Sequence, residues 1–270
     1  MAGPLGLGKA ALGAARYVAD GVAETLWPTR CAGCEAPGSL LCPECTAALP
    51  AIDQDRACRR CGAPFGSLVC TECNGCVARA SEEGADGGEG TGDGLECLDA
   101  VCCYGIHEWP LDRLIRVYKD AGERRAAPLL GRMIVQAVER SRILEGAPAA
   151  PGSPGPRVDA VTFVPCTPEA YARRGFDHME AVARTVAEGL GVPFLDALAR
   201  RAPQDQRGLG RADRTANARR SLVPVVPLDG ARLLLVDDVL TTGATLSAAA
   251  AALRAGGAVW VAGATVARAW

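Results

Sequence analysis

Residues 232–246, near the end of the chain, constrain the fold more than any other stretch. They read RLLLVDDVLTTGATL, in which a run of branched apolar residues stops abruptly at two acids. A loop of threonine and glycine follows, and then an alanine-rich segment with helical character over residues 247–254. This order predicts a buried parallel strand, a tight turn and the N-terminus of a helix. Buried parallel strands are typical of α/β proteins in which helices cover the sheet.

The predicted turn is suited to holding a phosphate monoester. The first N–H groups of a helix have no intrahelical partner, and the helix dipole adds positive potential there. The hydroxyls of Thr241, Thr242 and Thr245 add further donors, and Gly243 lets the backbone come close to a ligand. We therefore expect a phosphate site at this turn.

Asp237 and Asp238 stand at the carboxyl end of the predicted strand, where open α/β sheets bind ligands. Acids do not favour a phosphate, so we expect them to accept hydrogen bonds from vicinal hydroxyls or to position a hydrated cation. A phosphate beside a diol describes a ribose 5-phosphate. One alternative is that the acids only cap the next helix. Another is a phospho-acceptor pocket like that of response regulators, which usually lies on the first strand of its domain, whereas this motif begins at residue 232.

Eight cysteines form four Cys-x2-Cys knuckles early in the chain. They are Cys31 and Cys34, Cys42 and Cys45, Cys58 and Cys61, and Cys70 and Cys73. Each knuckle directs two thiolates at one ion, and two knuckles complete a tetrahedral four-sulfur site. A closed site of this kind predicts structural zinc, as one or two ions, rather than a catalytic metal. We expect pairing in sequence order, as two zinc ribbons. Interleaved pairing, Cys76 in place of Cys73, and free buried thiols are the alternatives.

Length and charge exclude several classes of protein. A chain of 270 residues has room for one α/β domain and a small module. A net charge of −2 gives no global electrostatic reason to bind nucleic acid or membrane. No apolar run approaches the roughly 20 residues that span a bilayer, and the charges of Arg16, Asp20 and Glu24 interrupt the alanine-rich opening segment. We expect a cytoplasmic protein without membrane insertion, in which thirteen cysteines serve metal ligation or burial rather than disulfides.

Composition divides the chain into four parts. We expect an N-terminal helix within 1–30, a cysteine-rich double zinc ribbon at 31–79, an acidic glycine-rich linker at 80–96, and an α/β domain at 97–270. In that domain, the patterns predict strands at 98–106, 158–164 and 258–266, helices at 111–120, 123–144 and 176–190, and loops at 145–157 and 166–175.

Other candidate residues lie outside the main motif. Arg173 and Arg174, followed by Gly175, form a predicted loop suited to a second anion such as pyrophosphate, because guanidinium groups match phosphate oxygens in bidentate geometry. A plain surface pair is the alternative. Lys119 suits either a specific ammonium role or a solvated surface position. His178 alone is expected to be a helix-surface residue.

Residues 200–220 hold seven arginines and almost no large apolar side chain. Such a segment cannot enter a core. It is typical of a basic lid that closes over a charged substrate and excludes water. A solvated linker or a nucleic-acid contact are the alternatives.

The main motif resembles the phosphoribosyl pyrophosphate (PRPP) binding motif of type I phosphoribosyltransferases. Nearly the whole chain, in the order of its pieces, resembles the ComF family of competence-associated proteins, which join a cysteine zinc module to a phosphoribosyltransferase domain. The matching pieces are the cysteine knuckles, Tyr104-Gly105, Tyr118-Lys119, Val164-Pro165, Arg174-Gly175-Phe176, Gln206, Arg214 with Asn217, and the motif at 237–245. One departure is Asp177-His178, where the family usually has Asn-Gln. A negative charge there weakens a nearby anion site or recruits Mg²⁺.

The resemblance implies a type I phosphoribosyltransferase-like fold that binds PRPP with Mg²⁺ and has a link to single-stranded DNA handling in transformation. Its partners would be single-stranded DNA or a competence helicase. Its implied catalytic residues are Asp237, Asp238, Arg214 and Lys119, and its pyrophosphate residues are Arg173, Arg174 and Gly175. Its implied PRPP-binding residues are Asp237, Asp238, Val239, Leu240, Thr241, Thr242, Gly243, Ala244 and Thr245.

Two functions fit these residues. One is an enzyme that transfers phosphoribosyl to an acceptor, with charge stabilisation and positioning as the main sources of catalysis. The other is a non-catalytic PRPP or nucleotide sensor that engages DNA or a partner. A purely structural zinc adaptor would leave the acids and the threonine loop without a role.

Overall fold

A computed structural model describes residues 28–66, 70, 73, 95, 97–147, 158–201 and 221–269. The chain separates into two compact units, Met1–Leu49 and Pro50–Trp270. The second group of four cysteines therefore belongs to the same unit as the sheet. The predicted N-terminal helix, most of the acidic linker, Cys76 and residues 202–220 with Arg214 lie outside the described residues.

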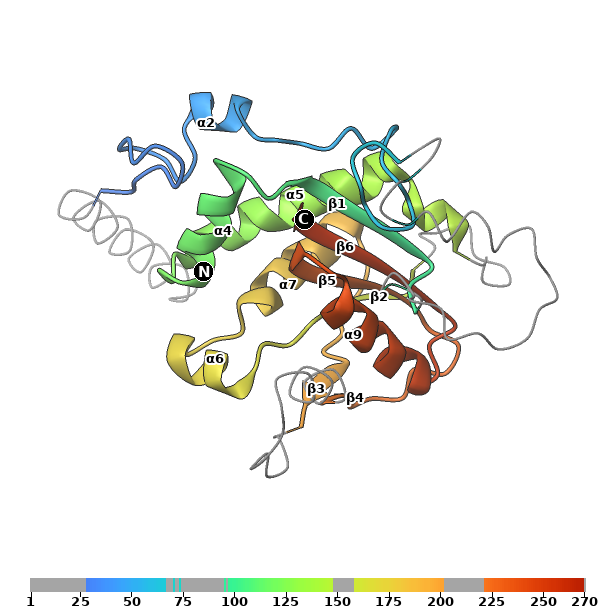
Figure 1. The fold of residues 1–270 in the computed structure, drawn as a ribbon. Helices are drawn as coiled ribbons and strands as arrows, with labels where there is room; N and C mark the ends of the chain where they lie inside the picture. Colours follow the sequence, from blue (N-terminus) through green and yellow to red (C-terminus); the bar gives the residue numbers. More distant parts are fainter. Residues whose placement is uncertain are drawn as a thin grey trace, which may run out of the picture. The chain divides into compact units, whose positions relative to one another are not determined.

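A four-stranded parallel sheet forms the centre of the unit Pro50–Trp270 (Figure 1). Its order is β1 (Ala100–Ile106), β6 (Trp260–Arg268), β5 (Arg232–Leu240) and β2 (Ala160–Phe163). The apolar run of β5 from Leu233 to Val236 is fully buried, as expected for a central strand covered on both faces. The predicted α/β class, a parallel sheet flanked by helices, is confirmed.

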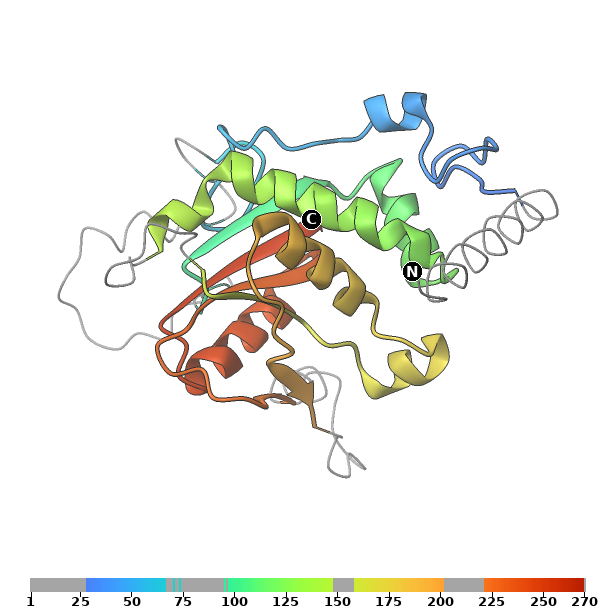
Figure 2. The same ribbon diagram turned by 180° about the vertical axis from the view of Figure 1, so that it is seen from behind.

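Helices cover both faces of this sheet. Figures 1 and 2 show α9 (Ala244–Ala255) on one face and α5 (Ala127–Ser141) with α7 (His178–Leu190) on the other. Helices α5 and α7 pack closely because α5 has Gly131 at the contact. A Cβ atom on Gly131 would lie 2.6 Å from the Cβ of Thr185. The short helix α4 (Leu111–Lys119) follows β1 and buries Leu111, Leu114, Ile115 and Tyr118.

Several predicted boundaries differ from the structure. The long helix expected at 123–144 is divided into η1 (Arg124–Ala126), α5 and η2 (Ile143–Gly146). Arg142, in a left-handed conformation with φ of 55°, ends α5 and separates it from η2. Of the exposed loop expected at 145–157, Glu145 is exposed at the end of η2, Ala147 is buried, and residues from 148 onward lie outside the described part of the chain.

The loop predicted at 166–175 is wrong, because a helix, α6 (Pro168–Arg174), forms there. Thr167 caps its N-terminus by accepting a hydrogen bond from the N–H of Ala170, and proline occupies the first turn. Gly175 ends the helix with φ of 73°. The antiparallel pair β3 (Leu198–Arg200) and β4 (Leu222–Pro224) was also not predicted, because three-residue strands carry little periodic signal.

The free edge of β1 is covered by the chain segment at residues 50–62. The N–H of Ile52 donates to Tyr104 O at 2.8 Å, and the N–H of Ile106 donates to Pro50 O at 2.8 Å. Farther along, the N–H of Val101 donates to Arg59 O at 2.7 Å. These bonds satisfy backbone groups that an edge strand otherwise leaves unpaired. None of the helices in the described ranges combines the length and apolar character needed to cross a membrane.

Candidate functional site

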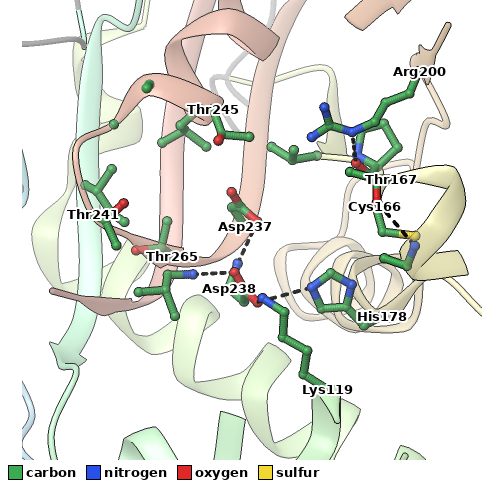
Figure 3. Close-up of a pocket in the computed structure, with 18 of the residues that line it drawn as sticks. Lys119, Cys166, Thr167, His178, Arg200, Asp237, Asp238, Thr241, Thr245 and Thr265 are labelled. Carbon is green, nitrogen blue, oxygen red and sulfur yellow. Dashed lines mark hydrogen bonds and ion pairs between the residues drawn. The ribbon is translucent and has the colours of Figure 1, made fainter. Parts of the chain in front are cut away.

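A cavity of about 250 Å³ opens at the carboxyl ends of β2 and β5 (Figure 3). Its walls come from the residues after β2, from the end of β5 with the following turn and the start of α9, from two residues of α6, and from single residues of α4, α7, β3 and β6. This is the edge at which parallel sheets of this kind bind ligands.

Most of the residues predicted for PRPP line this cavity. They are Asp237, Asp238, Val239, Leu240, Thr241, Gly243, Ala244 and Thr245, whereas Thr242 is not among the lining residues. Of the predicted pyrophosphate residues, Arg174 lines the cavity, and Arg173 and Gly175 do not. Lys119 lines it as well. The structure therefore brings together most of the motif at residues 237–245, Arg174 and Lys119.

The turn after β5 presents open backbone donors to the cavity. Gly243 adopts a left-handed conformation with φ of 76°, which an L side chain rarely takes, and α9 begins at the next residue. No side chain caps this helix. Among the described residues, no acceptor pairs with the N–H groups of Thr245 and Leu246. The turn thus keeps donors available for an anion at the positive end of the helix.

Asp238 receives hydrogen bonds on both oxygens. Lys119 Nζ donates to Oδ2, and the Nε2 of His178 lies 3.1 Å from the same oxygen. The N–H of Val239 donates to Oδ1 at 2.7 Å. Burial alone raises the pKa of Asp238, but the hydrogen bond from His178 and the charge of Lys119 outweigh it and lower that pKa well below its usual range. Asp238 is therefore an ionised carboxylate.

Asp237 differs from its neighbour. Burial and the charge of Asp238 raise the pKa of Asp237 to about 8. Its Oδ1 accepts the N–H of Asp238 at 2.9 Å. The two adjacent carboxyl groups therefore hold one negative charge between them near neutral pH, because repulsion and burial oppose a second.

The prediction that His178 is a helix-surface residue is wrong. It is the first residue of α7 and is only 5% exposed. Figure 3 shows its ring reaching Asp238 beside Lys119. Its Nδ1 lies 3.2 Å from Arg174 NH1. His178 is buried because α7 packs against the end of β5. Local sequence does not reveal this tertiary contact.

Asp177 acts as the N-terminal cap of α7. Its Oδ1 accepts the N–H of Met179 at 2.9 Å, and its Oδ2 accepts the N–H of Cys166 at 2.7 Å. The carboxylate therefore ties the cavity-lining segment after β2 to the start of α7.

Sequence reasoning did not single out four lining residues, which are Cys166, Thr167, Arg200 and Thr265. Arg200 donates from Nε to Pro165 O at 2.8 Å, and burial lowers its pKa. It is the first arginine of the basic segment, and its position at the end of β3 turns it toward the cavity. The short strand carried no signal that separates this arginine from the other six.

The eight knuckle cysteines form two groups in sequence order: Cys31, Cys34, Cys42 and Cys45, and Cys58, Cys61, Cys70 and Cys73. Within each group, all ligand sulfurs lie within 4.8 Å of one another. Neighbouring sulfurs are 3.5 Å to 3.6 Å apart. A tetrahedral zinc with Zn–S bonds of about 2.3 Å separates its sulfurs by about 3.8 Å. Both groups therefore fit structural zinc.

Comparisons with known proteins agree with these features. Residues 22–77 match the family model described as "Double zinc ribbon domain". The chain is 29% identical over 154 residues to "DNA utilization protein YhgH" of Salmonella typhi, covering 56% of this chain and 64% of that protein. It is 30% identical over 84 residues to "Competence protein ComFC" of Streptococcus pneumoniae, covering 31% of this chain and 36% of that protein. The chain thus spans less than two thirds of the length of either relative.

Among solved structures, glutamine PRPP amidotransferase from B. subtilis, complexed with ADP and GMP, is similar at 23% identity with a TM-score of 0.33. The similarity covers 53% of this chain and 26% of that one. A similarity at this TM-score does not assign a fold, so we assign the fold class from the parallel sheet of this chain. The double zinc ribbon model and the two relatives support the resemblance to the ComF family, with a zinc ribbon at the N-terminal end of the chain.

Proposed function

We propose that the cavity binds PRPP or a related ribose 5-phosphate together with Mg²⁺. The observation that carries this proposal is the presence, in one cavity, of the paired carboxyl groups Asp237 and Asp238 and the uncapped start of α9. The first suits a diol or a hydrated cation, and the second suits a phosphate. A ribose 5-phosphate offers both groups on one molecule.

Each part of the proposed ligand has lining residues of suitable chemistry in the cavity. The 5-phosphate takes the N–H groups and hydroxyls of the turn from Thr241 to Thr245, where the helix dipole favours an anion. The ribose hydroxyls donate to Asp237 and Asp238. The pyrophosphate lies toward Arg174 and Lys119, whose charges oppose its own.

In the enzymatic form of this proposal, the bond between C1 and the pyrophosphate oxygen breaks, and pyrophosphate leaves with the electron pair. The lone pair of an acceptor forms the new bond to C1, and the acceptor releases its proton to water. When bound, Mg²⁺ supplies positive charge to the pyrophosphate. Arg174, Lys119 and Arg200 hold the leaving group, and the Asp pair orients the sugar while positive charge develops on it.

The names of the two relatives support a setting in DNA utilisation and competence, with single-stranded DNA or a competence partner as the macromolecular contact. They also favour a second candidate, in which the cavity senses PRPP or a nucleotide without turnover and the protein binds DNA. Both candidates include a cytoplasmic location, where the thiolates of the two cysteine groups remain reduced.

Calorimetry with PRPP and Mg²⁺ tests the ligand. We expect the double variant Asp237→Asn, Asp238→Asn to bind at least about tenfold more weakly, because it loses the negative charge that the Asp pair offers to the diol or to Mg²⁺. Asp229→Asn makes the same chemical change outside the lining of the cavity and should bind like the parent. Equal affinity of the parent and the double variant would contradict the proposal.

Two further measurements separate the candidates. An enzyme releases pyrophosphate when PRPP is incubated with a pool of nucleobases, and a sensor binds PRPP without release. A DNA-binding sensor also shows an affinity for single strands that falls steeply as salt rises, because phosphate contacts release counterions.

A further inference from the structure

We propose that His178 is a positioning residue that links the two charged halves of the cavity, the Arg174 side and the Asp238 side. The identity of the ligand in this inference rests on the proposed function. The hydrogen bonds of His178, from which we infer its role, are independent of that function.

His178 lies between the two groups with one ring nitrogen toward each. Nδ1 is 3.2 Å from Arg174 NH1, and Nε2 is 3.1 Å from Asp238 Oδ2. The side chain is 7% exposed, so water does not take either place easily. Both contacts are therefore inside the wall of the cavity rather than on the surface.

The chemistry of the partners fixes the direction of both bonds. A guanidinium group only donates, so Nδ1 must accept with its lone pair. Asp238 is a carboxylate and accepts, so Nε2 must carry the proton. A ring protonated on both nitrogens would set an N–H against the N–H of Arg174. One tautomer alone satisfies both contacts.

The other groups that face this ring leave that assignment intact. Tyr118 donates to the backbone O of His178 and not to the ring. Asp177 Oδ1 lies 3.7 Å from Nδ1, beyond hydrogen-bond distance, and accepts a backbone N–H instead. Lys119 shares the Asp238 oxygen with Nε2. Asp120 lies 3.6 Å from Arg174 NH2, and its side chain is largely exposed.

The arrangement has a consequence for Arg174. Its side chain is 8% exposed, and its buried Nε has no acceptor among the described residues. The contact of Nη1 with His178 uses one of the five guanidinium N–H donors, so the guanidinium plane is fixed while other donors remain for a ligand oxygen. On the other side, the same ring holds Asp238 Oδ2 in place. His178 thereby sets the spacing between an anion site and a hydroxyl site.

Nitrogen NMR of the imidazole rings tests the bond directions directly. The chain has only two histidines, so His107 provides an internal reference. We expect ¹⁵N-labelled His178 to show a protonated Nε2 and an unprotonated Nδ1, without averaging between tautomers. A proton on Nδ1, or tautomer averaging like that of a solvated imidazole, would overturn the inference. This measurement needs no ligand, so it remains decisive even if the protein does not bind PRPP.

Variants test the role in binding. Glutamine keeps one acceptor and one donor, whereas leucine keeps neither, so we expect His178→Gln to bind PRPP with Mg²⁺ within about threefold of the parent and His178→Leu to lose about tenfold. Inorganic pyrophosphate with Mg²⁺ should show the same order. His107→Gln is the control and should bind like the parent.

Thermal unfolding of each variant shows whether the fold survives the change. A His178→Leu variant that binds as tightly as the parent would overturn the inference, and so would a folded His178→Gln variant as weak as His178→Leu. If the parent binds neither PRPP nor pyrophosphate, the proposed function fails, and the ring NMR alone decides the role of His178.

Discussion

Asp237 and Asp238 are neighbours in the chain, but they have different partners. Asp238 accepts hydrogen bonds from two side chains, Lys119 and His178, whereas Asp237 faces the cavity beside the charge of Asp238. Side chains alternate along a strand, so adjacent acids point in different directions and take on different chemistry. The pair thus supplies a fixed anion and a titrating group at one place.

This difference predicts how stability depends on pH. The pKa of Asp237 is about 8 in the folded protein and about 3.9 in an unfolded chain, so the folded state holds the proton more tightly. That contribution to stability is complete below about pH 4 and is lost as the pH rises through about 8. As the pH rises from about 6 to about 9, we expect the free energy of unfolding to fall less for Asp237→Asn than for the parent. Urea unfolding at both pH values measures this.

The asparagine side chain does not titrate, so the Asp237→Asn variant lacks this pH-dependent contribution to stability. Asp229→Asn serves as the control and should follow the parent curve. Parallel curves for Asp237→Asn and the parent would mean that Asp237 is already ionised in the folded protein at neutral pH.

A second prediction concerns the turn from Thr241 to Thr245, where we propose that the phosphate binds. Thr245→Val removes a hydroxyl that lines the cavity while keeping the shape of the side chain. We expect it to weaken ribose 5-phosphate binding by about 1.5–3 kcal/mol, the usual value for a hydrogen bond to a charged group. Thr245→Ser keeps the hydroxyl and should bind nearly as well as the parent. Calorimetry with both variants checks this, and equal affinities would exclude the hydroxyl as a donor.

Some residues of the candidate site could be predicted from the sequence, and others could not. The Asp pair and the threonine turn could be predicted because strand, turn and helix are local and the chemistry follows from their order. The roles of Arg173 and Arg174 could not be separated, because the segment was expected to be a loop. In the helix α6 that forms instead, adjacent residues point about 100° apart, and only Arg174 faces the cavity.

At the scale of elements, the second cysteine group and the sheet form one structure. Cys58, Cys61, Cys70 and Cys73 belong to the same apolar cluster as Val101 and Cys103 of β1. Gly62 touches β1 so closely that a Cβ atom there would lie 2.6 Å from Cys103 Sγ. The backbone bonds from residues 50–62 complete this contact. The second cysteine group therefore helps to stabilise the segment that covers β1, the edge strand of the sheet.

We expect Cys61→Ser to lower the unfolding temperature of the sheet unit and to speed hydrogen exchange at the β1 amides, because a weakened zinc site loosens the segment over that strand. Cys34→Ser, in the first cysteine group, makes the same change in the other unit and should leave β1 exchange unaltered. Exchange measured by mass spectrometry compares the two. Equal effects would contradict the link between the second group and the sheet.

At the scale of the whole molecule, composition predicts one cysteine module at residues 31–79, and the compact units defined by packing divide the chain between Leu49 and Pro50. Composition groups residues by type, and all four knuckles look alike. Packing groups residues by contact, and the second pair of knuckles shares an apolar cluster with β1. The order of the strands was equally out of reach, because periodicity does not reveal which strands pair.

Two truncations test this division. A chain that begins at Pro50 is expected to fold with zinc and to keep the PRPP affinity of the full chain. A chain that begins at residue 80 loses the cover of β1 and the second cysteine group, so we expect it to be strongly destabilised. Circular dichroism and calorimetry compare both with the full chain. A stable, ligand-binding chain from residue 80 would show that the sheet needs neither.

The cover over β1 has a consequence beyond stability. An uncovered strand of this sheet offers a row of unpaired amides and carbonyls to any other extended chain, including another copy of itself. The backbone bonds from residues 50–62 occupy those groups. Metal supply would then decide whether newly made chains stay dispersed or join edge to edge, so zinc starvation should appear first as aggregation in the cell.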